Sequence, residues 1–203
     1  MRPPSVLLIG SAGSGKDTVA DYLAAAYGYA VFHVADPLKR LIGDPAWEPV
    51  WEVLFPTGRP TKLRRELQEV GDLLRHWDPE MLVKMTSNAI RQNIRTHPGQ
   101  PWCLADVRLV NEFHAFHAQF PHARIIGLTA WDAQRAERLV ARDGTAPSGN
   151  WLAHPTEQQT TLLLERGVCD TVIANIGSRA DLRRAVDAVL TGPSRALAAG
   201  RAL

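Results

Sequence analysis

Cysteine is scarce in this chain of 203 residues, and long apolar runs are absent from it. Its two cysteines, Cys103 and Cys169, are too few for a disulfide framework and show no paired metal-binding spacing, so we expect a reducing compartment. No apolar stretch approaches the roughly 20 residues that span a bilayer, and the apolar run near the N-terminus is too short for a signal peptide. These absences predict a soluble, cytoplasmic protein with no membrane partner.

Net charge is also small. A formal charge of +2 gives no indication of nucleic-acid binding, although arginines cluster at 59–75, 91–95, 135–142 and 179–184. Local basic clusters of this kind suit small anionic substrates better than a nucleic acid. The 45% hydrophobic content is enough to build a core, and the length fits a single domain.

Short β-branched runs alternate with helical patterns, which is typical of a parallel sheet between layers of helices. The predicted strands are residues 5–10, 29–35, 101–107, 123–130 and 169–175. Helices are expected over 15–27, over 63–95 with a break at 78–79, from 131, from about 156, and over 179–190. The expected fold is an α/β three-layer sandwich around a five-stranded parallel sheet, with a hinge or lid tip at 143–150.

The stretch GSAGSGKDT (10–18) carries a phosphate-binding signature, in which Gly10, Gly15 and Lys16 match the pattern of a glycine, four residues and Gly-Lys. It follows an apolar strand and opens a helix, so loop amides and the helix N-terminus would face phosphates. This context favours nucleoside triphosphate binding over a chance glycine-rich turn. The predicted ATP contacts are Ala12, Gly13, Ser14, Gly15, Lys16, Asp17 and Thr18.

Two carboxylates are candidate ligands of Mg²⁺. Asp17 stands where the signature expects a hydroxyl, and its charge would be repelled by bare phosphate oxygens by roughly 4 kcal/mol at about 4 Å. We therefore predict that Asp17 meets Mg²⁺, directly or through water, and that Asp106, which ends a neighbouring strand, holds the other side of the ion. The alternatives are a helix-start role for Asp17 and a turn-capping role for Asp106.

A second anion site is predicted from RRELQEVGDLLRHWDP (64–79), where polar residues fall near one helical face and leucines and a valine on another. Arginines suit bidentate contact with a substrate phosphate. The same pattern also describes a solvated charged face. The predicted acceptor-binding residues are Asp36, Lys39, Arg65, Gln68, Asp72, Arg75, Arg108 and Glu112.

Three arginines in 131–144 have spacings of three and four, so they lie on one helical face. Like charges placed so repel one another unless an anion lies between them. We predict a lid in which Arg138 and Arg142 close over the transferring phosphoryl group, with Arg135 contacting ATP. Local pairing of these arginines with Asp132 and Glu137 is the alternative.

Several segments together resemble the deoxynucleoside monophosphate kinases of bacteriophages, within the adenylate-kinase-like branch of P-loop kinases. The likeness covers most of residues 5–190 and rests on GSAGSGKDTVADYL, ADPLKR, LQEVGDLLRHWDP, DVRLVNE, HPTE and VIANIGS. It implies one P-loop kinase domain, 1–203, with a core (1–40, 96–130, 169–192), a monophosphate-binding region (about 41–95) and a lid (about 131–168). It also implies ATP as donor, Mg²⁺ as cofactor, and Asn175 and Gly177 near the donor adenine, as in dephospho-coenzyme A kinases.

The expected reaction is in-line transfer of the γ-phosphoryl group of ATP to a (deoxy)nucleoside 5′-monophosphate. Its catalytic residues would be Lys16, Asp106, Arg138 and Arg142. Alternative acceptors are dephospho-coenzyme A and phosphomevalonate, and a different class of function is a nucleotide switch that hydrolyses ATP slowly. The base of the acceptor and the oligomeric state stay open, with a homodimer among the options.

Overall fold

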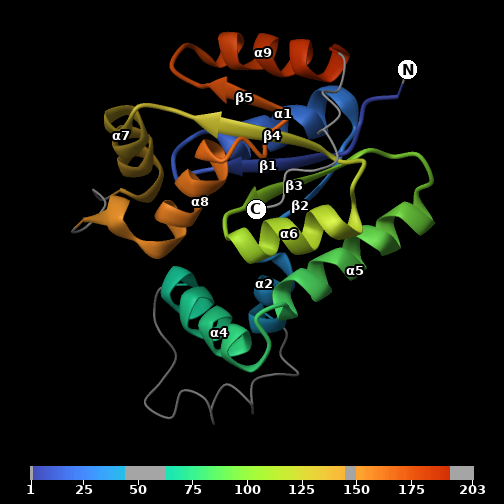
Figure 1. Cartoon of the computed structure of the whole chain (residues 1–203), viewed down its shortest axis with the longest axis vertical. Helices are drawn as coiled ribbons and strands as arrows, with labels where there is room; N and C mark the ends of the chain where they lie inside the picture. The colour runs from blue at the N-terminus through green and yellow to red at the C-terminus, as the bar shows by residue number, and fades with distance from the viewer. Residues whose placement is uncertain (1, 44–62, 145–149, 193–203) are drawn as a thin grey trace.

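The computed structural model describes residues 2–43, 63–144 and 150–192, and for residues 42 and 63–69 only the backbone. Within these ranges five parallel strands form one sheet in the order β2-β3-β1-β4-β5. The strands, drawn as arrows in Figure 1, are β1 (Val6–Gly10), β2 (Ala30–Phe32), β3 (Trp102–Val107), β4 (Arg124–Thr129) and β5 (Thr171–Ala174). Each strand lies inside its predicted range, which confirms the predicted parallel sheet.

Helices fill the segments between the strands. They are α1 (Lys16–Tyr27), α2 (Asp36–Gly43), α4 (Leu63–Trp77), α5 (Met81–Thr96), α6 (Val110–Gln119), α7 (Asp132–Asp143), α8 (Pro155–Glu165) and α9 (Arg179–Thr191), with a short 3-10 helix η2 (Trp151–Ala153) before α8. The predicted break at 78–79 separates α4 from α5. The predicted helices include neither α2 nor α6, whose eight and ten residues are shorter than the windows of 11–18 residues in which a helical period is usually counted.

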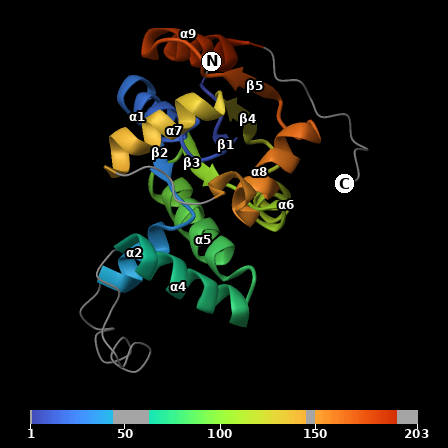
Figure 2. The same ribbon diagram turned by 90° about the vertical axis from the view of Figure 1, so that its left-hand side faces the viewer.

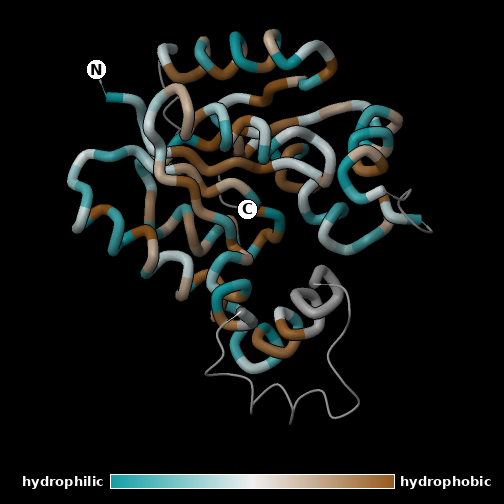
Figure 3. The backbone as a smooth tube through the Cα atoms, turned by 180° about the vertical axis from the view of Figure 1, so that it is seen from behind, coloured by the Kyte–Doolittle hydropathy of each residue, from teal (hydrophilic) through white to brown (hydrophobic). Residues whose placement is uncertain are grey.

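Alternating side chains of the central strand β1 divide the protein into layers, because successive residues of a strand point to opposite faces. Val6 and Leu8 belong to a buried cluster with α1 and α9, whereas Leu7 and Ile9 belong to a second cluster with α5 and α6. In Figure 1 the two pairs of helices lie on opposite sides of the sheet. The hydrophobic colouring of Figure 3 follows the strands between them. The α/β three-layer arrangement is thereby confirmed.

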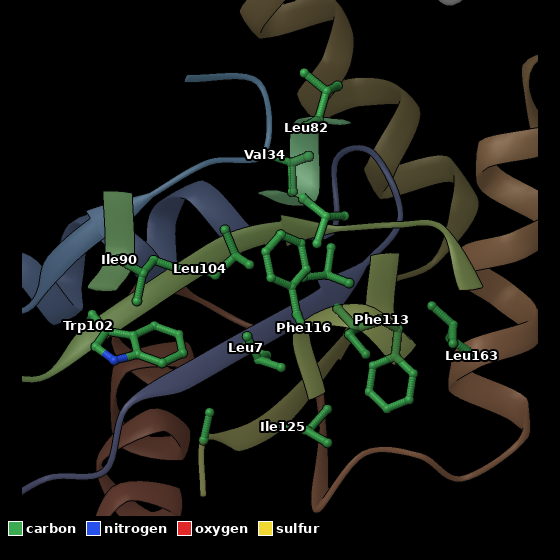
Figure 4. Close-up of a cluster of buried hydrophobic side chains, with 14 of the residues drawn as sticks. Leu7, Val34, Leu82, Ile90, Trp102, Leu104, Phe113, Phe116, Ile125 and Leu163 are labelled. Carbon is green, nitrogen blue, oxygen red and sulfur yellow. The ribbon is translucent and has the colours of Figure 1, made fainter. Parts of the chain in front are cut away.

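The larger cluster, on the α5–α6 side, is shown in Figure 4. Leu7, Leu104 and Ile125, from three neighbouring strands, meet Phe116 of α6, and all four are fully buried. Truncating a buried phenylalanine of this kind to alanine costs about 3–5 kcal/mol. This packing makes the sheet a rigid base for the loops that follow its strands.

The loops after the strands all open at one edge of the sheet, because parallel strands share one direction. Helices α7 and α8 stand at this edge, on the left of Figure 1, and α4 lies below them. Figure 2 shows α2 and α4 side by side, next to the start of α5. In the described part of the chain, none of the helices combines the length and the apolarity that crossing a membrane requires. Most of the predicted hinge, 145–149, lies outside the described residues.

Candidate active site

The phosphate-binding signature forms a tight loop between β1 and α1, over residues 11–15, which we call the phosphate loop. Gly13 and Gly15 have φ angles of +76° and +102°, in the left-handed region that glycine adopts most readily. A Cβ at Gly13 would lie 2.7 Å from the Arg135 carbonyl oxygen, and one at Gly15 would collide with the side-chain amide of Asn175. Both glycines are therefore required by backbone conformation and by close packing against neighbouring segments.

Four successive carbonyl groups of this loop accept hydrogen bonds from side chains of the surrounding structure. In order, these bonds are Lys16 Nζ to Ser11 O (3.0 Å), Arg135 Nε to Ala12 O (2.8 Å), Arg138 Nη1 to Gly13 O (3.2 Å) and Asn175 Nδ2 to Ser14 O (2.8 Å). These bonds fix the carbonyl oxygens of the loop. The first-turn N–H groups of α1 have no earlier helical carbonyl to bind, so they can donate to an anion.

Lys16 lies under the loop with only 4% of its surface exposed. Burial lowers the pKa of its ammonium group to about 7, and the positive charge of Arg108 acts in the same direction. The negative charges of Asp17, Asp106 and Glu157 oppose this lowering of the pKa. An incoming phosphate would favour the charged form of this lysine.

A cleft of about 530 Å³ opens over the loop, and we call it the donor cleft. It is lined by most of the predicted ATP contacts, namely Ala12, Gly13, Gly15, Lys16, Asp17, Thr18, Asn175 and Gly177, and by the predicted catalytic residues Arg138 and Arg142. Ser14 is buried beneath the loop and does not line the cleft. The prediction missed Arg179 and Leu182, which reach the cleft from α9 and whose sequence shows only an ordinary amphipathic helix.

The structure separates Arg135 from the other two predicted lid arginines. Its guanidinium is buried, and besides Ala12 O it donates to Asp132 Oδ1 at 2.8 Å and to Glu157. The ring of Trp151 lies 4.6 Å from the guanidinium carbon. Arg135 thus contacts the loop without lining the donor cleft, so its predicted ATP contact is not favoured by this geometry. Helical spacing alone could not separate Arg135 from Arg138, because burial depends on what packs against α7.

A second cleft, of about 830 Å³, adjoins the first, and we call it the acceptor cleft. Five predicted acceptor-binding residues line it: Lys39, Asp72, Arg75, Arg108 and Glu112. The prediction did not include His33 and His154, which also line it; His154 begins the HPTE segment of the resemblance but was given no role there. Arg65 and Gln68 belong to α4, but their side chains lie outside what the structure describes.

Asp36 does not line the acceptor cleft, in contrast to its predicted role. Its two carboxylate oxygens accept from His33 N at 2.8 Å and from Lys39 Nζ at 3.1 Å. Asp36 therefore closes the turn before α2 and pairs with its neighbour. A residue of this type at a helix start is a common capping element, which the sequence could not distinguish from a binding residue.

Glu112 lines the acceptor cleft, but its carboxylate is bound by groups of the protein itself. Its Oε2 accepts from the backbone N–H groups of Arg108 and Leu109 at 3.3 and 3.2 Å, and its Oε1 lies 3.8 Å from Arg75 Nη2. Burial raises the pKa of this carboxyl group, and the two backbone hydrogen bonds oppose the shift. Glu112 thus joins the loop after β3 to the start of α6 and lies beside Arg75.

The two clefts meet at three residues, because Asp17, Arg108 and Arg142 line both of them. Arg142 pairs with Asp143 at 2.7 Å. Within the described ranges, the Arg108 guanidinium has neither a hydrogen-bond acceptor nor an ion-pair partner. An unpaired arginine at the junction of two clefts is placed to hold an anion that extends between them.

The predicted Mg²⁺ ligands fit an ion held mainly by nucleotide phosphates. Asp17 is exposed at the junction, and Asp106 accepts from Val34 N at 2.7 Å through Oδ1, which leaves Oδ2 without a partner among the described residues. In the same part of the chain, no group of three or more His, Cys, Asp or Glu side chains is placed to hold a metal ion. Mg²⁺ ordinarily binds one or two carboxylates, substrate phosphates and several waters, so two carboxylates are sufficient.

Neither a protein-family model nor a curated protein sequence matches this chain significantly. Solved structures do. TT1252 from Thermus thermophilus is similar over 95% of this chain and 100% of its own, with a TM-score of 0.59 and 24% identity. A dephospho-CoA kinase from Campylobacter jejuni covers the same shares, with a TM-score of 0.53 and 15% identity. A shikimate kinase from Acinetobacter baumannii covers 92% of each chain, with a TM-score of 0.50 and 15% identity. This chain therefore has the fold that P-loop kinases share.

Proposed function

We propose that this chain is a nucleotide kinase that transfers the γ-phosphoryl group of ATP to a (deoxy)nucleoside 5′-monophosphate. The observation that carries the proposal is the junction of the donor and acceptor clefts at Asp17, Arg108 and Arg142. A nucleotide switch requires only a donor cleft. A second cleft that opens onto the same arginines supports transfer to an acceptor.

Donor binding would use the phosphate loop. Its amides and the N-terminus of α1 would hold the phosphate oxygens, and Lys16 would place its ammonium group on the β- and γ-phosphates. Arg138 reaches the cleft from α7 and already holds the carbonyl oxygens of Gly13 and Asn175. Mg²⁺, held by Asp17, Asp106 and the nucleotide itself, would supply charge neutralisation of the β- and γ-phosphates.

Acceptor binding would use the cations of the second cleft. Arg75 and Arg108 would hold the monophosphate, whose terminal oxygen is already anionic at neutral pH and needs no general base. Arg142 lies at the junction, where charge is spread over the transferring group in the transition state. The protein would thus act by positioning two anions in line and by neutralising their repulsion.

Deoxynucleoside monophosphates are the acceptors implied by the sequence resemblance to bacteriophage kinases. A second candidate is a larger acceptor such as dephospho-coenzyme A. The acceptor cleft has a volume of about 830 Å³, which lies toward the upper end of the range of 300–1,000 Å³ that is common for clefts binding drug-sized molecules. This volume supports a larger acceptor as the second candidate. The similarity to the Campylobacter jejuni enzyme supports the fold that both candidates require.

The test is a coupled assay of ADP release with Mg-ATP. The acceptors are the four deoxynucleoside monophosphates, their ribose counterparts, dephospho-coenzyme A, phosphomevalonate and a blank. We expect ADP release that depends on a nucleoside monophosphate and that Lys16→Met removes. Release that is equal with every acceptor and with the blank would instead indicate a switch, and release with dephospho-coenzyme A alone would select the second candidate.

A further inference from the structure

We infer that Glu157 and Arg135 act as a positioning pair for the phosphate loop. The inference rests on the proposed function, since it takes this loop to be the donor site. Glu157 Oε1 accepts from Ala12 N at 3.0 Å, and Arg135 Nε donates to Ala12 O at 2.8 Å. The second carboxylate oxygen of Glu157 accepts from Arg135 Nη2. The ion pair therefore binds both polar backbone groups of one loop residue.

These contacts fix two successive peptide units. Ala12 N belongs to the peptide that joins Ser11 to Ala12, and Ala12 O belongs to the peptide that joins Ala12 to Gly13. Rotation of either unit would break a hydrogen bond to a charged group, which is stronger than one between neutral groups. Gly13 follows directly, and its φ of +76° lies where glycine meets little steric resistance. The pair therefore restrains the loop next to one of its two glycines in the left-handed region.

Glu157 and Arg135 are both buried, and this burial argues against the view that the pair serves mainly to stabilise the fold. Glu157 is 6% and Arg135 is 7% exposed. A buried ion pair recovers little or none of its desolvation cost, and apolar residues of similar volume often replace such a pair without loss of stability. A buried pair that also binds the backbone of a ligand loop is better explained by the geometry that it imposes on the loop.

The pair also connects the loop to the predicted lid region. Arg135 belongs to the first turn of α7, and Glu157 belongs to the first turn of α8. Trp151, in η2 between these helices, packs its ring over the Arg135 guanidinium. The starts of both helices are thereby attached to Ala12, while Arg138 and Arg142 extend further along α7 toward the donor cleft. Neither Glu157 nor Arg135 lines the acceptor cleft.

The inference predicts a selective effect on the donor side. We expect Glu157→Gln to raise the KM for ATP and the Kd for ADP at least tenfold, and to change the KM for the acceptor by less than twofold. Glutamine can still accept from Ala12 N, but it lacks the charge and places an N–H₂ group or a neutral oxygen against Arg135. Glu165→Gln is the matched control, since Glu165 is an exposed carboxylate of the same helix.

A double variant separates positioning from stability. Arg135→Met with Glu157→Leu replaces the ion pair by apolar side chains, so we expect its melting temperature to stay near that of the parent protein, while ADP binding is weakened as in Glu157→Gln. If the double variant fails to fold, the single variant still decides the question. Calorimetric binding of ADP without acceptor measures the effect independently of phosphoryl transfer.

Three results would overturn the inference. Glu157→Gln could bind ADP as tightly as the parent protein, which would refute the pair and leave the proposed function intact. It could weaken ADP and acceptor binding equally, together with a lowered melting temperature, which would indicate a structural role. A parent protein that binds neither ADP nor ATP would refute the inference together with the proposed function.

Discussion

The side-chain amide of Asn175 donates a hydrogen bond to the carbonyl oxygen of Ser14 at 2.8 Å and so joins the end of β5 to the phosphate loop. Asn175 is buried, and its backbone carbonyl oxygen accepts from Arg138 Nη2 at 2.9 Å. The same amide occupies the space that a side chain at residue 15 would need. The end of the edge strand β5, helix α7 and the phosphate loop are therefore joined by hydrogen bonds.

Asn175→Ala should weaken donor binding and leave acceptor binding nearly unchanged. The substitution leaves Ser14 O without its partner, and an unsatisfied buried acceptor costs about 1–3 kcal/mol. We therefore expect the Kd for ADP, measured by calorimetry, to rise roughly fivefold or more. Asn93→Ala is the control, because Asn93 belongs to α5 and lines neither cleft. An ADP affinity within twofold of the parent value would show that this bond does not shape the loop.

Binding of ADP without metal at pH 8 should take up close to one proton. Lys16 has a pKa of about 7 when the site holds no anion, so the lysine is mostly neutral at pH 8, and bound phosphates should return its charge. Affinity for ADP should accordingly decrease as the pH rises above 7. Calorimetry in two buffers of different ionisation enthalpy measures this uptake, and the terminal phosphate of ADP, with a pKa of about 6, contributes little at pH 8.

The control for this experiment is Lys16→Met, for which the uptake should vanish along with most of the phosphoryl transfer. An equal uptake in the variant would assign the proton to another group. No uptake in the parent protein would mean that Lys16 keeps its charge before the nucleotide arrives.

Substitution of Arg108 and of Arg75 by alanine should affect different kinetic parameters. Arg108 lines both clefts, so Arg108→Ala should lower kcat about 100-fold or more, a barrier increase of about 2.7 kcal/mol, and also raise the KM for the acceptor. Arg75 lines only the acceptor cleft, so Arg75→Ala should mainly raise the KM for the monophosphate. Steady-state kinetics with both substrates varied tests this difference. Identical profiles for the two variants would contradict the assignment of Arg108 to the junction.

Asp17→Asn should raise the Mg²⁺ concentration that half-maximal activity requires at saturating ATP, and should reduce turnover. Asp17 is exposed at the junction of the clefts, where its carboxylate can meet the ion or its water shell. Asp21→Asn is the matched control, because Asp21 is an exposed carboxylate one turn further along α1. An unchanged Mg²⁺ titration would leave Asp17 as a residue that only suits the first turn of a helix.

Local sequence was sufficient to predict the sheet and the phosphate loop. Apolar β-branched runs mark strands wherever they occur, because their side chains pack on a pleated surface, and each observed strand lies inside its predicted range. The loop signature is equally local, since Gly13 and Gly15 take backbone angles that are determined within a few residues. These parts of the protein could be found without knowledge of the tertiary fold.

Tertiary structure decided which polar side chains face the clefts. The spacing of Arg135, Arg138 and Arg142 predicted one common face, but packing against Glu157 and Trp151 turns Arg135 to the back of the loop. Asp36 is a charged residue of the kind that binds substrates, but its contacts are those of a residue that caps a helix start.

The contacts that hold the loop come from distant parts of the chain. Glu157 lies 145 residues from Ala12, and Asn175 lies 161 residues from Ser14. A periodic pattern reports which face of a helix is apolar, whereas partners at such separation are set by the order of the strands and the helices packed on them. The sequence alone therefore determined where the glycine-rich loop lies, between β1 and α1, and only the folded structure determined which residues hold that loop in shape.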